Sequence, residues 1–224
     1  MTPSPTTTAA PPWRAPVRRA ARRVAAAAIV LFARLVTAPQ AVWAGVAPDA
    51  TQRVWFANHS SHGDLVLIWT VLPESLRRRV RPVAAADYWL GSRLRRFVGC
   101  TVFRALLIER HGRGRDTDPI GAMTDALDDG DSLILFPEGT RNTTEEPLLP
   151  FRAGLHRLAS ARPDVELVPV WIANLNRVLP KGEFLPVPLL CRVTFGEPVR
   201  LGDGETREAF LARARTALLE LSER

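Results

Sequence analysis

The sequence predicts an α/β fold: a single domain with a largely parallel central sheet flanked by helices, preceded by an N-terminal helical segment. The chain has 224 residues, 46% apolar and 24% charged, which suffices for one domain with a full core. From Asp49 onward, short apolar runs alternate with helical stretches, as in sheets with crossover helices. No Asp or Glu precedes Asp49, and composition and periodicity together divide the chain into residues 1–12, 13–47 and 48–224.

The first two segments differ in their periodicity. Residues 1–12 have no apolar period and are expected to form a disordered tail. From residue 13 a basic amphipathic helix is predicted, because five arginines share one helical stripe while Val and Ala occupy the other side. These arginines are Arg14, Arg18, Arg19, Arg22 and Arg23. Ten residues without a polar side chain follow at 24–33.

Residues 13–47 are interpreted as membrane-associating helices. A bilayer crossing needs about 20 apolar residues, and residues 24–47 supply them only if Arg34, Pro39 and Gln40 are included. An arginine near the centre of a span is unfavourable by about 2.5 to 3.5 kcal/mol. We therefore favour a pair of helices that lie in the membrane interface and pack on the domain. A single spanning anchor, or an Ala-rich helix buried in the domain, remains open.

The positive charge of the chain is concentrated in this segment. The formal net charge is +7, and six arginines precede the first acidic residue, so residues 49–224 are near neutral. No zinc-finger, helix-turn-helix or RNP motif accompanies the charge, so nucleic acid is not an expected partner. An anionic membrane surface is the expected partner instead.

The two cysteines, Cys100 and Cys191, have neither the number of a disulfide scaffold nor the spacing of a metal site. They are expected to be buried thiols in a reducing compartment. We therefore expect the protein at the cytoplasmic face of the cell membrane, attached peripherally or by a single N-terminal anchor.

The domain itself reads as alternating strands and helices. The apolar run 53–57 predicts a strand that ends just before His59, and a helix is expected at 65–71, after a polar turn. Further on, short apolar runs predict strands, and longer stretches predict helices, one of them closed by Gly130. In order, these are strand 81–85, helix 92–100, strand 105–108, helix 120–128, strand 132–136, helix 154–161, strands 166–172 and 192–196, and an amphipathic helix at 207–222.

The first chemical motif pairs His59 with Asp64. On an ideal helix two residues five apart point about 140° away from each other, so these side chains meet only if His59 lies in a loop and Asp64 in the first turn of the next helix. Ser61 to Asp64 has the form of a capping box, which predicts a helix starting there. Asp64 as a mere helix cap, with His59 as a surface histidine, is the alternative.

A histidine with an ordinary pKa of about 6.5 suits a general base, and a carboxylate fixes its tautomer. In this interpretation the nucleophile is a substrate hydroxyl, so neither Ser60 nor Ser61 need react, and covalent serine catalysis is the weaker alternative. A metal site at His59, His62 and Asp64 is a further alternative, but hydrolases of that kind need more ligands. The chain offers only His111 and His156 besides, and His62 is expected to be exposed.

The second motif is Phe136-Pro137-Glu138-Gly139-Thr140-Arg141, which follows a predicted buried strand. Loops at the carboxyl ends of strands are where α/β proteins bind ligands. Gly139 permits close backbone approach, and Arg141 offers a planar fork suited to a phosphate. The alternative is a solvated loop with an ion pair.

Together these two motifs resemble the signature blocks of the glycerolipid acyltransferases, the family that contains lysophosphatidic acid acyltransferase. Two further blocks agree in order. Leu107 to Arg110 resembles the family's apolar strand that ends in Arg, although Ala105 stands where the family has Gly. Val168-Pro169-Val170-Trp171 resembles the strand that carries Pro beside the catalytic cleft, and Phe151 to Gly154 resembles its Phe-Lys-x-Gly segment, with Arg for Lys.

The resemblance implies a fatty acyl transfer from acyl-CoA or acyl carrier protein to a glycerolipid hydroxyl, most simply position 2 of 1-acylglycerol 3-phosphate. It implies His59 as general base and Asp64 as its partner. The implied acceptor-binding residues are Glu138, Gly139, Thr140, Arg141 and Arg110, with Pro169 at the acyl wall. No metal or redox cofactor is implied. Acylation of another lipid, such as a lyso-ornithine lipid or a glycolipid, and an inactive membrane-binding protein are the alternatives.

Overall fold

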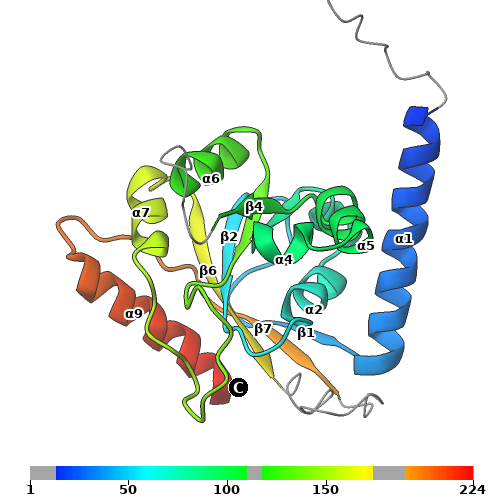
Figure 1. The fold of residues 1–224 in the computed structure, drawn as a ribbon. Coiled ribbons are helices and arrows are strands. Elements are labelled where there is room, and N and C mark those ends of the chain that lie inside the picture. Colours follow the sequence, from blue (N-terminus) through cyan, green and yellow to red (C-terminus); the bar gives the residue numbers. More distant parts are fainter. Residues whose placement is uncertain (1–13, 110–117, 174–189, 224) are drawn as a thin grey trace, which may run out of the picture.

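The computed structural model describes residues 14–109, 118–173 and 190–223. Within them, helices cover both faces of a seven-stranded sheet of order β1-β7-β6-β2-β5-β3-β4 (Figure 1). The strands are β1 Gln40–Trp43, β2 Arg53–Ala57, β3 Val80–Ala85, β4 Leu106–Ile108, β5 Ser132–Leu135, β6 Glu166–Ala173 and β7 Arg192–Phe195.

Most of the sheet is parallel, as predicted. Strands β6, β2, β5, β3 and β4 pair in parallel with their neighbours, whereas β7 runs antiparallel to β6, and β1 runs parallel to β7. Strand β2 is central and buried at every position, as expected for a strand covered on both faces. Because β2 and β5 are parallel neighbours, the loops that follow them lie at the same edge of the sheet.

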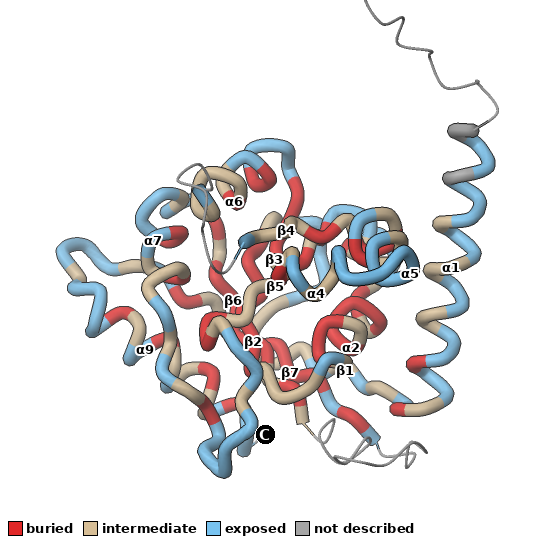
Figure 2. Tube along the Cα trace, viewed as in Figure 1, coloured by how far each residue is buried: buried red, intermediate tan, exposed pale blue. Residues whose placement is uncertain are grey.

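Two helical layers form two cores, one on each face of the sheet (Figure 2). Trp55 and Ala57 point into the first core and Val54 and Phe56 into the second, because successive side chains of a strand alternate. The first layer contains α1 Arg14–Thr37, α2 Asp64–Val71, α3 Glu74–Arg77, α4 Ala86–Leu90, α5 Arg93–Arg96 and the π-helix η1 Phe97–Val102. The second contains α6 Pro119–Asp128, α7 Gly154–Ala161, α9 Arg207–Leu219 and the 3-10 helix η2 Glu220–Glu223.

The N-terminal segment is one helix followed by a strand. Helix α1 confirms the predicted helix start, but the prediction of a second helix was wrong, because β1 occupies Gln40–Trp43. Ala38, at a φ of 35°, and Pro39 end the helix, and the chain then pairs with β7. No helix in the described ranges is long and apolar enough to cross a bilayer. The expected tail at 1–12 lies outside the described residues.

The remaining elements agree with the sequence to within a few residues, with three exceptions. The helix predicted at 92–100 is divided into α5 and η1, and the short helices α3 and α4 were not predicted, because four or five residues are too few to show a helical period.

Of the two cysteines, Cys191 is buried, as expected, but the prediction that Cys100 is buried was wrong. Cys100 is exposed on η1, where its neighbours Gly99 and Val102 take the buried positions instead.

Candidate active site

The backbone around His59 is fixed by its neighbours on the sheet. His59 follows β2 at the carboxyl edge, after Asn58. The buried Asn58 side chain donates to the carbonyl of Ile172 at 3.0 Å and accepts from its N–H at 2.8 Å, so it extends the pairing of β2 with β6 by side-chain bonds. This contact sets the direction in which the chain leaves the sheet, and therefore the place of His59.

His59 and Asp64 are in contact. Asp64 is the first residue of α2 and is fully buried, and its Oδ2 lies 2.8 Å from Nδ1 of His59. The same oxygen accepts from the backbone N–H groups of Ser60 at 2.7 Å and Ser61 at 2.8 Å. The predicted geometry, with His59 in the loop and Asp64 in the first turn, is confirmed. One carboxylate oxygen of Asp64 thus binds both the backbone of the loop and the His59 side chain.

The tautomer of His59 follows from this contact. A carboxylate only accepts hydrogen bonds, so Nδ1 carries the proton and Nε2 keeps its lone pair. Among the described residues none hydrogen-bonds to Nε2, and the side chain is 15% exposed. The imidazole therefore has a basic nitrogen that a small reactant can reach.

The loop after β5 lies against His59. The Phe136 ring stacks on the imidazole at a centroid distance of 4.2 Å, and the N–H of Asn142 donates to the His59 carbonyl at 2.6 Å. The two sequence motifs, far apart in the chain, thus form one site at the carboxyl edge of β2 and β5.

The buried Glu138 side chain, in the loop after β5, hydrogen-bonds to the loop that carries His59. Its Oε1 accepts from the His59 N–H at 2.8 Å, while Oε2 accepts from the Leu149 N–H at 2.9 Å. Burial raises the pKa of this carboxyl, and the two backbone N–H groups partly offset the rise. Both of its oxygens therefore bind backbone in this structure, and contact with an acceptor stays a prediction.

Gly139 stands where only glycine fits. Its φ is +69°, and an added Cβ would come within 2.5 Å of the Arg152 side chain. Arg152 lies across the turn and donates from Nε to the Glu138 carbonyl at 3.2 Å. The Phe-Arg-Ala-Gly segment recognised in the sequence thus closes over the Glu138 turn.

Thr140 and Arg141 are exposed in the loop that bonds to the His59 backbone. Arg141 immediately precedes Asn142, whose N–H binds the His59 carbonyl. Desolvation, and then the positive charge of Arg141, lower the pKa of His62, so the Arg141 guanidinium is near that imidazole. His62 is exposed, as predicted, and stacks on the Tyr88 ring at 4.7 Å. The roles of Thr140 and Arg141 in binding stay predictions.

Pro169 lies in β6, an interior strand of the sheet. Proline has no backbone N–H, so it cannot donate a hydrogen bond to a neighbouring strand there. Pro169 lies beside Phe56 of β2 and is buried. Opposite it, the β6–β7 pairing shifts by one residue, since Val170 faces Phe195 but Leu167 faces Val199. Pro169 is therefore at a β-bulge, the setting in which a strand tolerates proline.

One predicted residue, Arg110, and the metal alternative remain. Arg110, the expected second acceptor-binding arginine, and His111 lie outside the described residues. In the described part of the chain no three His, Cys, Asp or Glu side chains are grouped as a metal site would need. His156 packs against Phe210 of α9 at 5.9 Å instead.

Several supporting residues were not assigned from the sequence. Asn58 stands inside the first motif, and its place just before His59 at a strand end was the one signal available. The contacts of Phe136 and Asn142 with His59, and of Glu138 with Leu149, join residues far apart in the chain, which no local pattern encodes.

Comparison with known proteins agrees with this fold. Residues 44–173, more than half of the chain, match the acyltransferase family. A protein of Dictyostelium discoideum named "Taffazin" is 30% identical over 162 residues, which are 67% of this chain and 53% of that protein. The chain thus spans about half the length of this curated relative.

A solved structure shares the fold. It is the 1-acyl-sn-glycerophosphate (LPA) acyltransferase PlsC from Thermotoga maritima, with a TM-score of 0.64 over 92% of this chain and 83% of that one, at 21% identity. The fold, the paired motifs and the family match lead to one conclusion: the chain belongs to the acyltransferase family.

Proposed function

We propose that the protein transfers a fatty acyl group from acyl-CoA or acyl carrier protein to the sn-2 hydroxyl of 1-acyl-sn-glycerol 3-phosphate, giving phosphatidic acid. The observation that carries the proposal is the contact of His59 Nδ1 with the buried Asp64 carboxylate at 2.8 Å, which leaves Nε2 as a base. An acyltransferase acting on a hydroxyl needs such a base and little else.

The reaction proceeds by direct attack. Nε2 of His59 takes the proton of the acceptor hydroxyl while its oxygen attacks the thioester carbonyl carbon. The resulting imidazolium is stabilised by Asp64, whose Oδ2 is held in place by the Ser60 and Ser61 N–H groups. When the tetrahedral intermediate collapses, the C–S bond breaks and the leaving thiolate takes the proton from His59. No metal or redox cofactor takes part, because the thioester is already an activated acyl donor.

The loop after β5 is proposed to bind the acceptor phosphate. Arg141 presents an exposed guanidinium in the loop whose Asn142 N–H bonds to the His59 carbonyl, and Gly139 makes the turn of the same loop. A guanidinium binds two phosphate oxygens at once, which orients the glycerol hydroxyl toward Nε2. Arg110 is proposed to add a second guanidinium, Thr140 a hydroxyl, and Pro169 part of the acyl-binding wall. Glu138 contributes through the loop that it holds.

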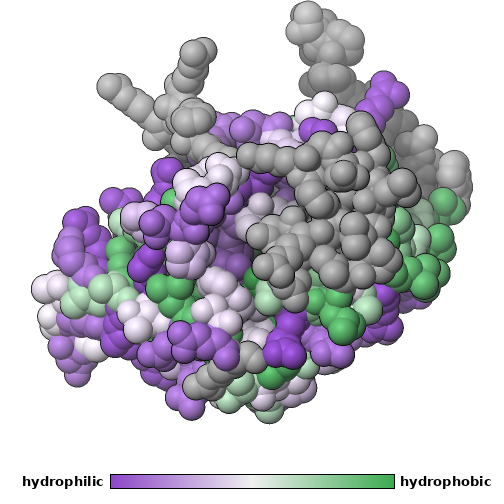
Figure 3. All heavy atoms as spheres, turned by 90° about the horizontal axis from the view of Figure 1, so that it is seen from below, coloured by the Kyte–Doolittle hydropathy of each residue, from purple (hydrophilic) through white to green (hydrophobic). Residues whose placement is uncertain are grey.

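The membrane is the proposed location, at the cytoplasmic face. The outer side of α1 exposes large apolar side chains, which gather at the right of the molecule in Figure 3. They are Val17, Val24, Leu31, Phe32 and Leu35. Arginines flank them on the same helix, so α1 has the two components of an interfacial helix on an anionic bilayer.

The identity of the acceptor has an alternative, because the two similar proteins carry different names. One is a lysophosphatidic acid acyltransferase, and the other is named "Taffazin". A lyso-ornithine lipid or a glycolipid is the competing acceptor class.

One assay distinguishes these acceptors. Thiol release from acyl-CoA and from acyl carrier protein is measured with lysophosphatidic acid, with each competing lipid, and with no acceptor. Release that depends on lysophosphatidic acid supports the proposal. Release that depends only on another lipid would replace the acceptor, and no transfer with any donor would favour an inactive membrane-binding protein.

A further inference from the structure

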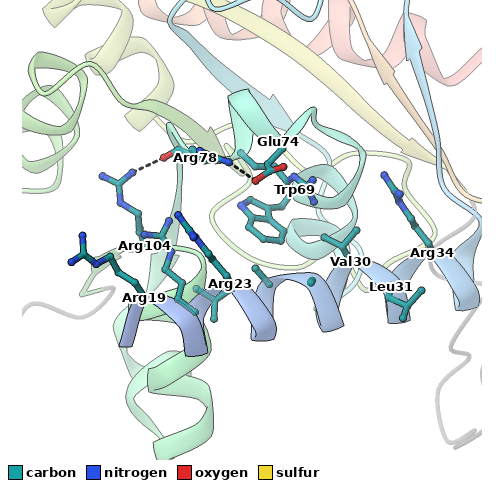
Figure 4. A pocket seen from close by; sticks show the side chains of 14 residues that line it. Arg19, Arg23, Val30, Leu31, Arg34, Trp69, Glu74, Arg78 and Arg104 are labelled. Atoms are coloured by element: carbon teal, nitrogen blue, oxygen red, sulfur yellow. Dashed lines mark hydrogen bonds and ion pairs between the residues drawn. The ribbon is translucent and has the colours of Figure 1, made fainter. Parts of the chain in front are cut away.

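A groove lies between part of α1 and the domain, and seven of its 14 lining residues are arginines. Its volume is about 650 Å³, within the range of small-ligand pockets. Arg19, Arg22, Arg23 and Arg34 come from α1, and Arg77, Arg78 and Arg104 come from the opposite wall (Figure 4). Glu74 is the one acidic residue among the described lining residues.

Carboxylates neutralise few of these charges. Arg78 pairs with Glu74 at 2.6 Å, and Arg104 pairs with Asp131 at 2.8 Å. Within the described ranges, no carboxylate forms an ion pair with the remaining five lining arginines. Seven guanidinium groups against these two carboxylates leave five positive charges in the groove that no carboxylate of the described residues balances.

The two walls place like charges opposite one another. The positive charges of Arg104 and Arg78, after desolvation, lower the pKa of Arg22, and Arg34 does the same to Arg77. An arginine remains charged despite such shifts, so the repulsion persists until an anion enters. The buried Nε of Arg77 also has no hydrogen-bond partner among the described residues. That atom is not exposed, and the Arg77 guanidinium lies over the Trp69 ring at 5.3 Å, so the donors open to a ligand are the exposed N–H groups of the lining arginines without an ion pair.

The floor of the groove is apolar. Trp69 of α2 lies between the arginine groups (Figure 4), and the other apolar lining residues are Ala26, Ala27, Val30 and Leu31 of α1 and Val102 of η1. A ligand that suits both features has an anionic group for the guanidinium groups and a hydrocarbon part for the floor. The volume admits a single headgroup with the start of its chains and excludes a folded protein domain.

Neither His59 nor Asp64 lines the groove. Arg78 and Arg104 precede β3 and β4, so they lie at the amino ends of the parallel strands. His59 follows β2, at the carboxyl ends. The end of the groove formed by Arg78 and Arg104 is thus at the opposite edge of the sheet from His59, whereas Arg34, shortly before β1, lines the end nearer the carboxyl edge.

We propose that this groove binds the phosphate headgroup of one anionic phospholipid, and that the bound lipid bridges α1 and the domain. The phosphate accepts hydrogen bonds from Arg22 on one wall and Arg77 on the other. Its glycerol and upper chains lie over Trp69 and Val30, beside the exposed apolar side of α1. The lipid supplies the negative charge that the fold itself lacks there.

The test measures binding of dihexanoyl phosphatidylglycerol to the full chain by calorimetry, below the lipid's micelle concentration. Arg22→Gln with Arg77→Gln removes one guanidinium from each wall and should weaken binding at least about ten-fold, the loss expected for one charge-assisted hydrogen bond. The matched control, Arg93→Gln with Arg157→Gln, removes two exposed charges outside the groove and should bind within about two-fold of the wild type. Equal losses in both variants would overturn the proposal.

Three further ligands identify the occupant. Dihexanoyl phosphatidylcholine should bind at least about ten-fold more weakly, because its headgroup has no net charge. Inorganic phosphate should also bind more weakly, because it leaves the Trp69 floor uncovered; affinity equal to the lipid's would make this a free-phosphate site. Acyl carrier protein should bind the wild type and the groove variant alike. Loss of carrier binding, with lipid binding retained, would assign the groove to the carrier instead.

Protein stability separates a binding role from a structural one. Without lipid, Arg22→Gln alone should raise the thermal midpoint, because it relieves repulsion from Arg78 and Arg104. A lower midpoint would mean that Arg22 holds the fold and would count against the proposal. Because no acyl donor is present, the result does not depend on which acceptor is acylated.

Discussion

Glu138→Gln should destabilise the protein and displace His59. The Glu138 carboxylate accepts from the His59 and Leu149 N–H groups at 2.8 and 2.9 Å and is 2% exposed. A glutamine has one acceptor oxygen, so its NH₂ group must face one of these two N–H donors. A buried donor left without a partner costs about 1 to 3 kcal/mol. We expect a loss near 2 kcal/mol, or roughly 4 to 8 °C in thermal midpoint for a chain of this length.

Activity should fall together with stability in this variant. His59 loses the anchor of its N–H, and a misplacement of about 1 Å can lower turnover about 100-fold. Thermal unfolding and kcat are measured for Glu138→Gln and for Glu145→Gln, an exposed residue of the same loop, which should change stability by less than about 0.5 kcal/mol. An unchanged midpoint and kcat with a raised acceptor KM would refute the reasoning and give Glu138 a direct role in acceptor binding.

The unfolding free energies of the wild type and of Glu138→Gln should depend on pH in different ways. Burial raises the Glu138 pKa above its ordinary 4.5, so the folded state binds the proton more tightly than the unfolded state does. The stability that Glu138 contributes is therefore full below about pH 4.5 and declines as pH rises through its raised folded value. The difference in unfolding free energy between wild type and Glu138→Gln should shrink over that interval, and a growing difference would contradict the shift.

Three other changes test single features of the site and fold. Arg141→Lys keeps the charge but loses the bidentate fork, so acceptor KM should rise about ten-fold and donor KM less than two-fold in steady-state assays; equal rises would indicate a structural role. Gly139→Ala should lower the free energy of unfolding by at least about 1 to 2 kcal/mol in denaturant titrations, since a left-handed residue gains a Cβ against Arg152. Cys100 should react quickly with iodoacetamide in the native protein and Cys191 only after unfolding, because burial raises the Cys191 pKa to about 11; mass mapping of labelled peptides checks this.

Local patterns were sufficient for much of the fold. The apolar run of β2 and the Gly130 that ends α6 are local features that predicted their elements. The capping form at Ser61 to Asp64 predicted the start of α2, but the N-cap is Gly63, and of the box only the bond from the Ser61 N–H to the Asp64 carboxylate forms. Helix geometry gave the condition for a His59–Asp64 contact, because a spacing of five residues permits it only at a loop–helix junction, and the family resemblance gave the expectation that the contact forms.

What could not be predicted depends on contacts between distant residues. Strand β1 reads as apolar and helix-compatible, and only its pairing with β7 decides its structure. Glu138 reads as a loop carboxylate, whereas in the fold it accepts from backbone N–H groups on two other segments. The arginine groove lies between α1 and residues that precede β3 and β4. No sequence motif predicts that these segments pack side by side.

The central claim is that His59 is the general base of acyl transfer, and one rate measures it. His59→Ala should lower the rate of transfer to lysophosphatidic acid by about 10² to 10⁴-fold, the usual effect of removing a general base. Its circular dichroism should stay near that of the wild type, because the His59 backbone bonds to Glu138 and Asn142 remain, while its thermal midpoint should fall modestly, because the buried Asp64 carboxylate loses the His59 hydrogen bond. A purified, folded His59→Ala protein whose transfer rate stays within a few-fold of the wild type would contradict the claim.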